Sequence, residues 1–281
     1  MGPARIELSG RYEHVATDNR ALAVQRRFDP ISVSAGLSYD WADGVRTALN
    51  LYRTERAPAA EELFSDGPHL ATAAFEVGDP ALAKEVARGG EASLRIEAES
   101  VSFTLTGFFT DYRDFIFEAF TGDEEDGLPV LAFAQASARF LGGEAEAAAR
   151  LYDGPIWQVR ADLAADIVRA TNRAQDEPLP RIPPKSLLVG LGAFSNAVDA
   201  RLDVELAASQ NRIGARESAT PGYAALHADL TWHPLGQAGG LRVILQGRNL
   251  TDSVMRRHTS FLKDILPLPG RSVRLAARLD F

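Results

Sequence analysis

The chain has 281 residues, a net charge of −8 and no cysteine. Its acidic balance argues against a nucleic-acid-binding protein, and the lack of cysteine excludes disulfides and cysteine-ligated metals. No stretch reaches the length of about 18 consecutive apolar residues that a membrane helix needs.

The predicted elements are β-strands, because apolar and polar residues alternate along most of the chain. This alternation gives each strand one apolar and one polar face, and it predicts an all-β chain of about twelve antiparallel strands. The alternating segments are 5–14, 31–41, 45–51, 91–98, 101–109, 143–151, 157–167, 186–194, 201–210, 223–232, 241–250 and 270–281.

The segment 143–151 has an alanine and glutamate content that also suits a helix. Its alanines nevertheless oppose Glu144 and Glu146, and the turn sequence YDGP follows at 152–155. We therefore predict a strand here. The last segment alternates up to Phe281, a terminal aromatic residue of the kind that ends the closing strand of bacterial outer-membrane barrels.

The connections between the predicted strands alternate strictly in length. The short connections are 42–44, 99–100, 153–155, 195–199 and 234–240, and the long ones lie near 15–28, 56–88, 118–132, 171–183, 212–221 and 251–269. A transmembrane β-barrel has this arrangement, with short periplasmic turns and long outer loops. All tryptophans lie beside short connections, and three other aromatic residues fall at the same end, which predicts an interfacial girdle: Trp41, Trp157, Trp232, Tyr39, Tyr152 and Phe281.

The polar faces of the strands carry charges of both signs, which suits the inside of a wide barrel. No nucleophile, base and orienting group come together in the sequence. We therefore expect no catalytic site and no enzyme activity. A hydrolase on the barrel would need a serine beside a histidine such as His227, and no serine lies in obvious register. A soluble β-rich binding protein is a further alternative.

The segment 51–85 resembles the strand and large outer loop of TonB-dependent outer-membrane receptors, most closely the subgroup that includes zinc-uptake receptors. The segments 108–117 and 247–271 are similar to other strand and loop regions of this family. The residues that carry the main resemblance are Arg56, Ala57, Pro58, Glu62, Leu63, Phe64, Gly67, Pro68, His69, Ala71, Thr72, Phe75, Glu76, Gly78, Asp79, Leu82 and Glu85.

This resemblance implies a protein of the Gram-negative outer membrane that takes up a metal or metal chelate. Such receptors have a barrel of about 22 strands around an N-terminal plug, and the TonB energy complex drives them. We expect residues 1–281 to be one domain, the C-terminal part of such a barrel, because no signal peptide, TonB box or plug is apparent. Expected partners are outer-membrane lipid, the plug, the remaining strands and TonB, but not nucleic acid. A passive porin-like channel is the alternative.

The substrate is predicted in two alternative ways. His69, Glu76 and His258 lie in outer loops, and imidazole and carboxylate groups are suitable zinc ligands, although their spacing does not demand a site. Alternatively, Arg56 with Phe64 and Phe75 holds a siderophore or another chelate, whose own atoms bind the metal. In both cases the metal is cargo, and no resident cofactor is expected.

Overall fold

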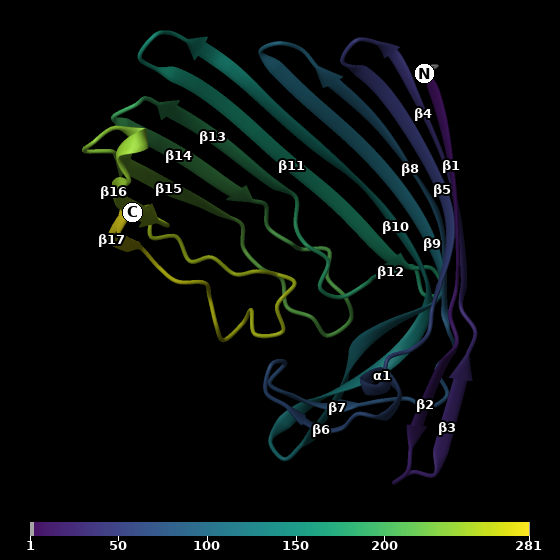
Figure 1. Ribbon diagram of the computed structural model, residues 1–281. Coiled ribbons are helices and arrows are strands. Elements are labelled where there is room, and N and C mark those ends of the chain that lie inside the picture. The colour runs from purple at the N-terminus through teal and green to yellow at the C-terminus, as the bar shows by residue number, and fades with distance from the viewer. Residues whose placement is uncertain (1–2, 281) are drawn as a thin grey trace.

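The structure, a computed structural model, describes residues 3–280 and consists mainly of one curved antiparallel wall (Figure 1). Its strands follow one another in the order β1-β4-β5-β8-β9-β10-β11-β13-β14-β15-β16-β17, which confirms the prediction of twelve strands. Their bounds are β1 (Ala4–Tyr12), β4 (Ile31–Ala42), β5 (Val45–Arg56), β8 (Glu85–Glu97), β9 (Val101–Glu125), β10 (Leu128–Asp153), β11 (Gln158–Asn172), β13 (Ser186–Phe194), β14 (Val198–Ala207), β15 (Tyr223–Trp232), β16 (Leu241–Arg248) and β17 (Ser272–Leu279).

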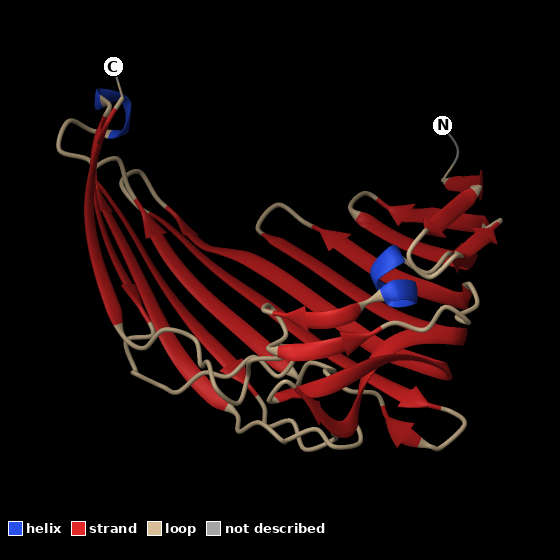
Figure 2. Ribbon diagram, turned by 90° about the horizontal axis from the view of Figure 1, so that it is seen from below, coloured by secondary structure: helices blue, strands red, loops and turns tan. Residues whose placement is uncertain are grey.

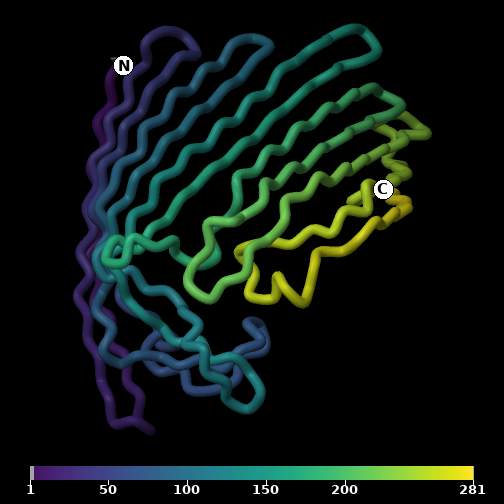
Figure 3. The backbone as a smooth tube through the Cα atoms, turned by 180° about the vertical axis from the view of Figure 1, so that it is seen from behind, coloured from purple at the N-terminus to yellow at the C-terminus, as the bar shows by residue number. Residues whose placement is uncertain are grey.

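The long connections carry all the smaller elements except one 3₁₀ turn, and they gather at one end of the wall, opposite the short turns (Figure 3). The first holds the hairpin of β2 (Val15–Asn19) and β3 (Val24–Phe28). The second holds α1, β6 and β7, with β7 running parallel to β10 (Figure 2). Among residues 3–280, no helix combines the length and the apolar character that crossing a membrane requires. The other bounds are α1 (Ala60–Phe64), β6 (Asp66–His69), β7 (Ala74–Val77), β12 (Glu177–Pro178) and the 3₁₀ turn η1 (Gln237–Gly239).

The prediction of a long loop at 118–132 is wrong. There β9 and β10 continue as a hairpin to the turn at Asp126 and Gly127, with Leu128 opposite Glu125. Two register shifts interrupt this hairpin, one between residues 129 and 131 and one between 136 and 138. A bulge changes the phase of the alternation, so a period of two cannot be followed through it. The predicted strand at 143–151 is confirmed as part of β10.

The outer face of the wall exposes large apolar side chains on nearly every strand, from Leu8 on β1 to Leu275 on β17. Trp41, Trp157 and Trp232 are 66%, 40% and 52% exposed. Each lies beside a short turn, although Trp157 precedes β11 by one residue. Tyr39 and Tyr152 lie at the same end, whereas Phe281 is outside the described residues. An apolar face bordered by aromatic side chains is the surface that a membrane barrel turns towards lipid.

The polar face carries ion pairs, which offset the cost of removing charges from bulk water. Arg201 of β14 reaches Asp162 of β11 at 2.8 Å and Asp203 at 2.6 Å. Arg248 of β16 reaches Asp229 of β15 at 2.8 Å. Charges of both signs on this face are therefore paired within β14, across β13 and between the neighbouring strands β15 and β16.

We predict that the three tryptophans occupy one depth at the periplasmic interface, because their strands end at the same edge of the wall. Variants with a single remaining tryptophan, placed in vesicles of lipids brominated at different positions along the acyl chain, should all be quenched most by the same lipid. Maximum quenching by a different lipid for each variant would contradict this placement.

Candidate functional site

His69 and Glu76 meet across the β6–β7 hairpin. Gly67 pairs with Glu76 and His69 with Ala74, so the two side chains are diagonal neighbours. The Nδ1 atom of His69 lies 2.7 Å from Oε1 of Glu76, and the Thr72 hydroxyl donates to the same oxygen at 2.8 Å. The Glu76 carboxylate is buried, whereas 55% of the His69 side chain is exposed. The hairpin thus presents an imidazole whose orientation a buried carboxylate fixes.

His258 is part of a different cluster and is fully buried between two loops. Its Nδ1 atom is 3.0 Å from the Thr220 hydroxyl, and its Nε2 atom is 3.3 Å from Oε1 of Glu217. Both ring nitrogens therefore face side chains of the 208–222 loop. His258 joins this loop to the 249–271 loop, and its imidazole is not open to solvent.

Arg181, from the loop between β11 and β13, connects this cluster to β9. Its guanidinium group is 3.1 Å from Glu118 and lies over the Phe261 ring, 3.8 Å from its centroid. Its backbone N–H donates to Glu217 at 2.9 Å. Three long connections and β9 are thus tied together by a cluster that we call the loop network: Glu118, Arg181, Glu217, Thr220 and His258.

The electrostatics of the loop network follow from its burial. Desolvation raises the pKa of Glu118; Arg181 opposes this shift and the nearby Glu76 carboxylate adds to it. Desolvation also raises the pKa of Glu217, but His258 and the backbone N–H groups of residues 214 and 181 outweigh it and lower that pKa.

The residues predicted to hold a chelate are all engaged within the protein. Arg56 binds Glu85 at 2.5 Å and Glu62 at 2.8 Å, and so fastens α1 to β8. Phe64 packs against the buried cluster of Phe28, Leu63, Leu82 and Ile116. Phe75 is buried in β7, opposite Pro68. The structure does not bring these three side chains to one open surface.

His69 and Glu76 supply two potential metal donors at one place. Within residues 3–280, no group of three or more histidine, aspartate or glutamate side chains is arranged to hold a metal ion. The structure brings together two of the three predicted ligands, and it places His258 in the loop network with Glu217 and Thr220 instead.

Comparison with known proteins identifies the family. Residues 2–250 match the family model described as "TonB dependent receptor-like, beta-barrel". The chain belongs to the TonB-dependent receptor family. Its place is therefore the outer membrane of Gram-negative bacteria, and the family to which it belongs is one of receptors.

Solved structures of this receptor family share the fold. The copper transporter OprC superposes with a TM-score of 0.83 at 21% identity, covering 99% of this chain and 45% of OprC. The FrpB iron transporter from Neisseria meningitidis superposes with a TM-score of 0.75 at 16% identity, covering 100% of this chain and 44% of FrpB. The ferric enterobactin receptor PfeA from Pseudomonas aeruginosa superposes with a TM-score of 0.70 at 16% identity, covering 100% of this chain and 43% of PfeA. The chain spans less than half the length of these three proteins.

Sequence inspection missed the centre of the loop network in this receptor chain. Arg181 lies in the run Pro180-Arg181-Ile182-Pro183, and it adopts a positive φ of 58°. An arginine held between prolines in a loop is a weak signal of a fixed conformation. The partners Glu118 and Glu217 carry no local signal, because they meet Arg181 only in the folded chain.

Glu55, next to Arg56, anchors the outer loop of the receptor and gives it a predicted acid sensitivity. Burial raises its pKa, but Lys84 at 2.5 Å, the Ile31 N–H at 2.9 Å and Arg53 outweigh burial and lower it to about 2. A carboxyl group whose pKa is lower in the folded state than in the unfolded state stabilises the fold at pH values above its unfolded-state pKa. This contribution is lost as the pH falls through its folded-state pKa. Glu55→Gln should therefore cost about 2 kcal/mol at neutral pH.

Urea unfolding of the chain in detergent micelles measures this effect. The difference between wild type and Glu55→Gln should shrink as the pH falls from 4.5, the ordinary pKa of a glutamate side chain, towards about 2. Glu13→Gln, which removes the partner of Arg11 in a solvent-exposed pair, is the matched control and should change little. A difference for Glu55→Gln that does not depend on pH would contradict the assignment.

Proposed function

We propose that this chain forms part of the wall and the outer loops of a receptor that takes up a metal or metal chelate, with TonB supplying the energy. The observation that supports this most is the His69–Glu76 pair, an exposed imidazole held by a buried carboxylate at the outer-loop end. OprC transports copper, FrpB transports iron and PfeA is a ferric enterobactin receptor, so metal cargo is common among the similar structures.

The ligand contact that we propose is through His69. Glu76 engages Nδ1, which selects Nε2 as the nitrogen that can bind a metal. One imidazole with one carboxylate cannot complete the four-coordinate shell typical of zinc in proteins. We therefore favour a chelate or partly complexed metal that brings most of its own donor atoms and offers one open coordination position to His69.

The partners that we propose follow from the two ends of the sheet. Within the described residues, β1 pairs only with β4 and β17 only with β16. In a membrane, unpaired edge N–H and C=O groups are too costly to leave exposed to lipid, so the wall has to close. We propose that further strands of the complete receptor pair with β1 and β17, and that a plug occupies the enclosed space and contacts TonB.

Binding measurements on the 281-residue chain in detergent micelles test the ligand proposal. The probes are Cu²⁺, Zn²⁺ and ferric enterobactin, titrated by calorimetry. We expect one probe to bind, and His69→Ala to weaken its binding about tenfold because one coordinating nitrogen is lost. His258→Ala should change the affinity for the probe only indirectly, through the packing of the loops.

His14 provides a matched control. Its Nδ1 atom lies 2.9 Å from Asp29, and its side chain is 57% exposed, so His14→Ala removes a similar exposed pair from another outer segment. Equal affinities of the His69→Ala, His14→Ala and wild-type chains would remove His69 from the site. Failure of all three probes to bind would leave the passive channel as the better explanation.

A further inference from the structure

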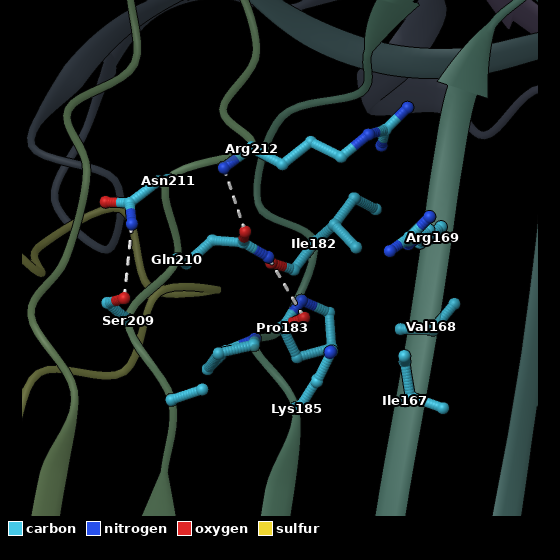
Figure 4. A pocket seen from close by; sticks show the side chains of 12 residues that line it. Ile167, Val168, Arg169, Ile182, Pro183, Lys185, Ser209, Gln210, Asn211 and Arg212 are labelled. Atoms are coloured by element: carbon cyan, nitrogen blue, oxygen red, sulfur yellow. Dashed lines mark hydrogen bonds between the residues drawn. The ribbon is translucent and has the colours of Figure 1, made fainter.

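A cavity of about 280 Å³ opens beside the outer end of β11 and is lined by three cations and no carboxylate (Figure 4). The cations come from three segments: Arg169 from β11, Lys185 from the residue before β13, and Arg212 from the 208–222 loop. The cavity exists because pairing between β11 and β13 begins only at Asp166 and Ser186, whereas β12 pairs with β11 only at Thr171 and Asn172. Residues 167–169 of β11 therefore lie in a gap between β12 and β13.

The three cations of this cavity lack acidic partners. No carboxylate of residues 3–280 lies within the 4.0 Å ion-pair distance of Arg169, Lys185 or Arg212. Arg212 donates instead to Ala170 O at 2.7 Å and to the Thr171 hydroxyl at 2.6 Å. Three positive charges around one small space create a potential that favours an anion.

Several other cations near the outer end of the wall do have acidic partners. Arg53 pairs with Glu55, Arg139 with Asp111 and Arg271 with Asp252. The charges of these three arginines are therefore neutralised by neighbouring carboxylates. The cavity is a place where uncompensated positive charge is concentrated next to open space.

The cavity also adjoins the apolar outer face of the wall. Ile167, which lines it, is two residues from Arg169 on the same face of β11, and Leu187 has the same relation to Lys185. Ile167, Leu141 on β10 and Val189 on β13 are 37%, 57% and 39% exposed. The charged groups thus sit directly beyond the lipid-facing surface, where long cationic side chains reach headgroups while their stems cover apolar atoms.

We propose that this cavity binds a phosphate group of an outer-leaflet lipid, with Arg169 and Lys185 as its main contacts and Arg212 adding positive charge. The acyl chains of the lipid then lie along Leu141, Ile167 and Val189. Arginine–phosphate contacts are strong, charge-assisted and often bidentate. The occupant is a lipid and not a transported anion, because Arg169 and Lys185 lie on the outer face of the wall. This inference rests on the membrane position of the wall and not on the proposed metal ligand.

Native mass spectrometry of the full 281-residue chain in detergent micelles tests the proposal. The probes are a bisphosphorylated disaccharide lipid, the same lipid without its phosphates, and inorganic phosphate. We expect the phosphorylated lipid to remain bound to wild type, and Arg169→Ala with Lys185→Ala to weaken its binding about tenfold or more. The unphosphorylated lipid should bind wild type and this double variant equally.

Two further double variants separate a lost contact from lost charge and lost fold. Arg169→Lys with Lys185→Arg keeps both charges and should retain the lipid. Arg20→Ala with Arg27→Ala removes the same charge from the β2–β3 region and should also retain it. Retention of the phosphorylated lipid by the Arg169→Ala, Lys185→Ala chain at the wild-type level would overturn the proposal. So would inorganic phosphate binding as tightly as the lipid, which would indicate a site for free anions.

Discussion

Replacing Arg181 with methionine should strongly loosen the outer loops of this receptor chain. The substitution leaves Glu118 buried without its cationic partner, whereas Glu217 keeps its bond to the backbone N–H of residue 181. Removing one member of a buried ionic cluster costs about 3–5 kcal/mol, because the remaining charge is uncompensated. Amide hydrogen exchange in the loops 173–185, 208–222 and 249–271 should accelerate by about a hundredfold or more, while the centres of the wall strands keep their protection.

Arg173→Met is the matched control for this experiment. Arg173 lies in the same loop, but its side chain is 52% exposed and it approaches Asp111 only to 3.5 Å. Surface substitutions of this kind change stability by at most about 0.5 kcal/mol. If Arg181→Met and Arg173→Met gave the same exchange rates as wild type, the loop network would not be what orders these loops.

Gly78→Ala should detach α1 from the end of β7. A Cβ atom at position 78 would lie 2.5 Å from the backbone N of Phe64 and 2.7 Å from the backbone N of Ser65. The Gly78 N–H also donates to Ser65 O at 2.7 Å, so the two segments cannot separate without losing this bond. Overpacking against backbone atoms costs about 1–3 kcal/mol. The displacement would expose Leu63, which is fully buried.

Limited proteolysis of the 57–84 loop measures the effect of Gly78→Ala. The variant should be cleaved in this loop well before wild type, with the wall left intact. Gly67→Ala, in β6, is the matched control, because a Cβ atom there would meet nothing within 4 Å. Equal cleavage rates of the Gly78→Ala and Gly67→Ala chains would show that α1 does not depend on this close approach.

The wall of the receptor could be predicted from the sequence because its two faces meet different surroundings. Strands such as β4 and β14 alternate cleanly, since one face carries exposed apolar side chains and the other carries polar ones. The alternation of apolar and polar residues is lost in the outer part of β9. Phe115, Ile116 and Phe117 are consecutive in β9, and both faces of the strand are covered there by buried clusters. A strand that is covered on both faces loses its alternation.

The candidate site could be predicted only in part. The loop motif identified His69 and Glu76, but their separation of seven residues fits neither a helical nor a strand pair. Their contact depends on the hairpin turn, in which Ala73 adopts a positive φ of 50°. The loop network lay beyond prediction, because Arg181 meets Glu118 and Glu217 across 63 and 36 residues of sequence. Contacts of that range depend on the arrangement of the whole wall.

The most direct test of the proposed function is metal accumulation by cells that express the gene encoding this chain. Cells are supplied with isotopically labelled copper, zinc or ferric enterobactin, and uptake is compared between strains with and without TonB. We predict that one labelled cargo accumulates only when TonB is present, and that His69→Ala reduces its accumulation whereas His14→Ala does not. Equal accumulation with and without TonB would contradict energised uptake and would indicate a passive channel.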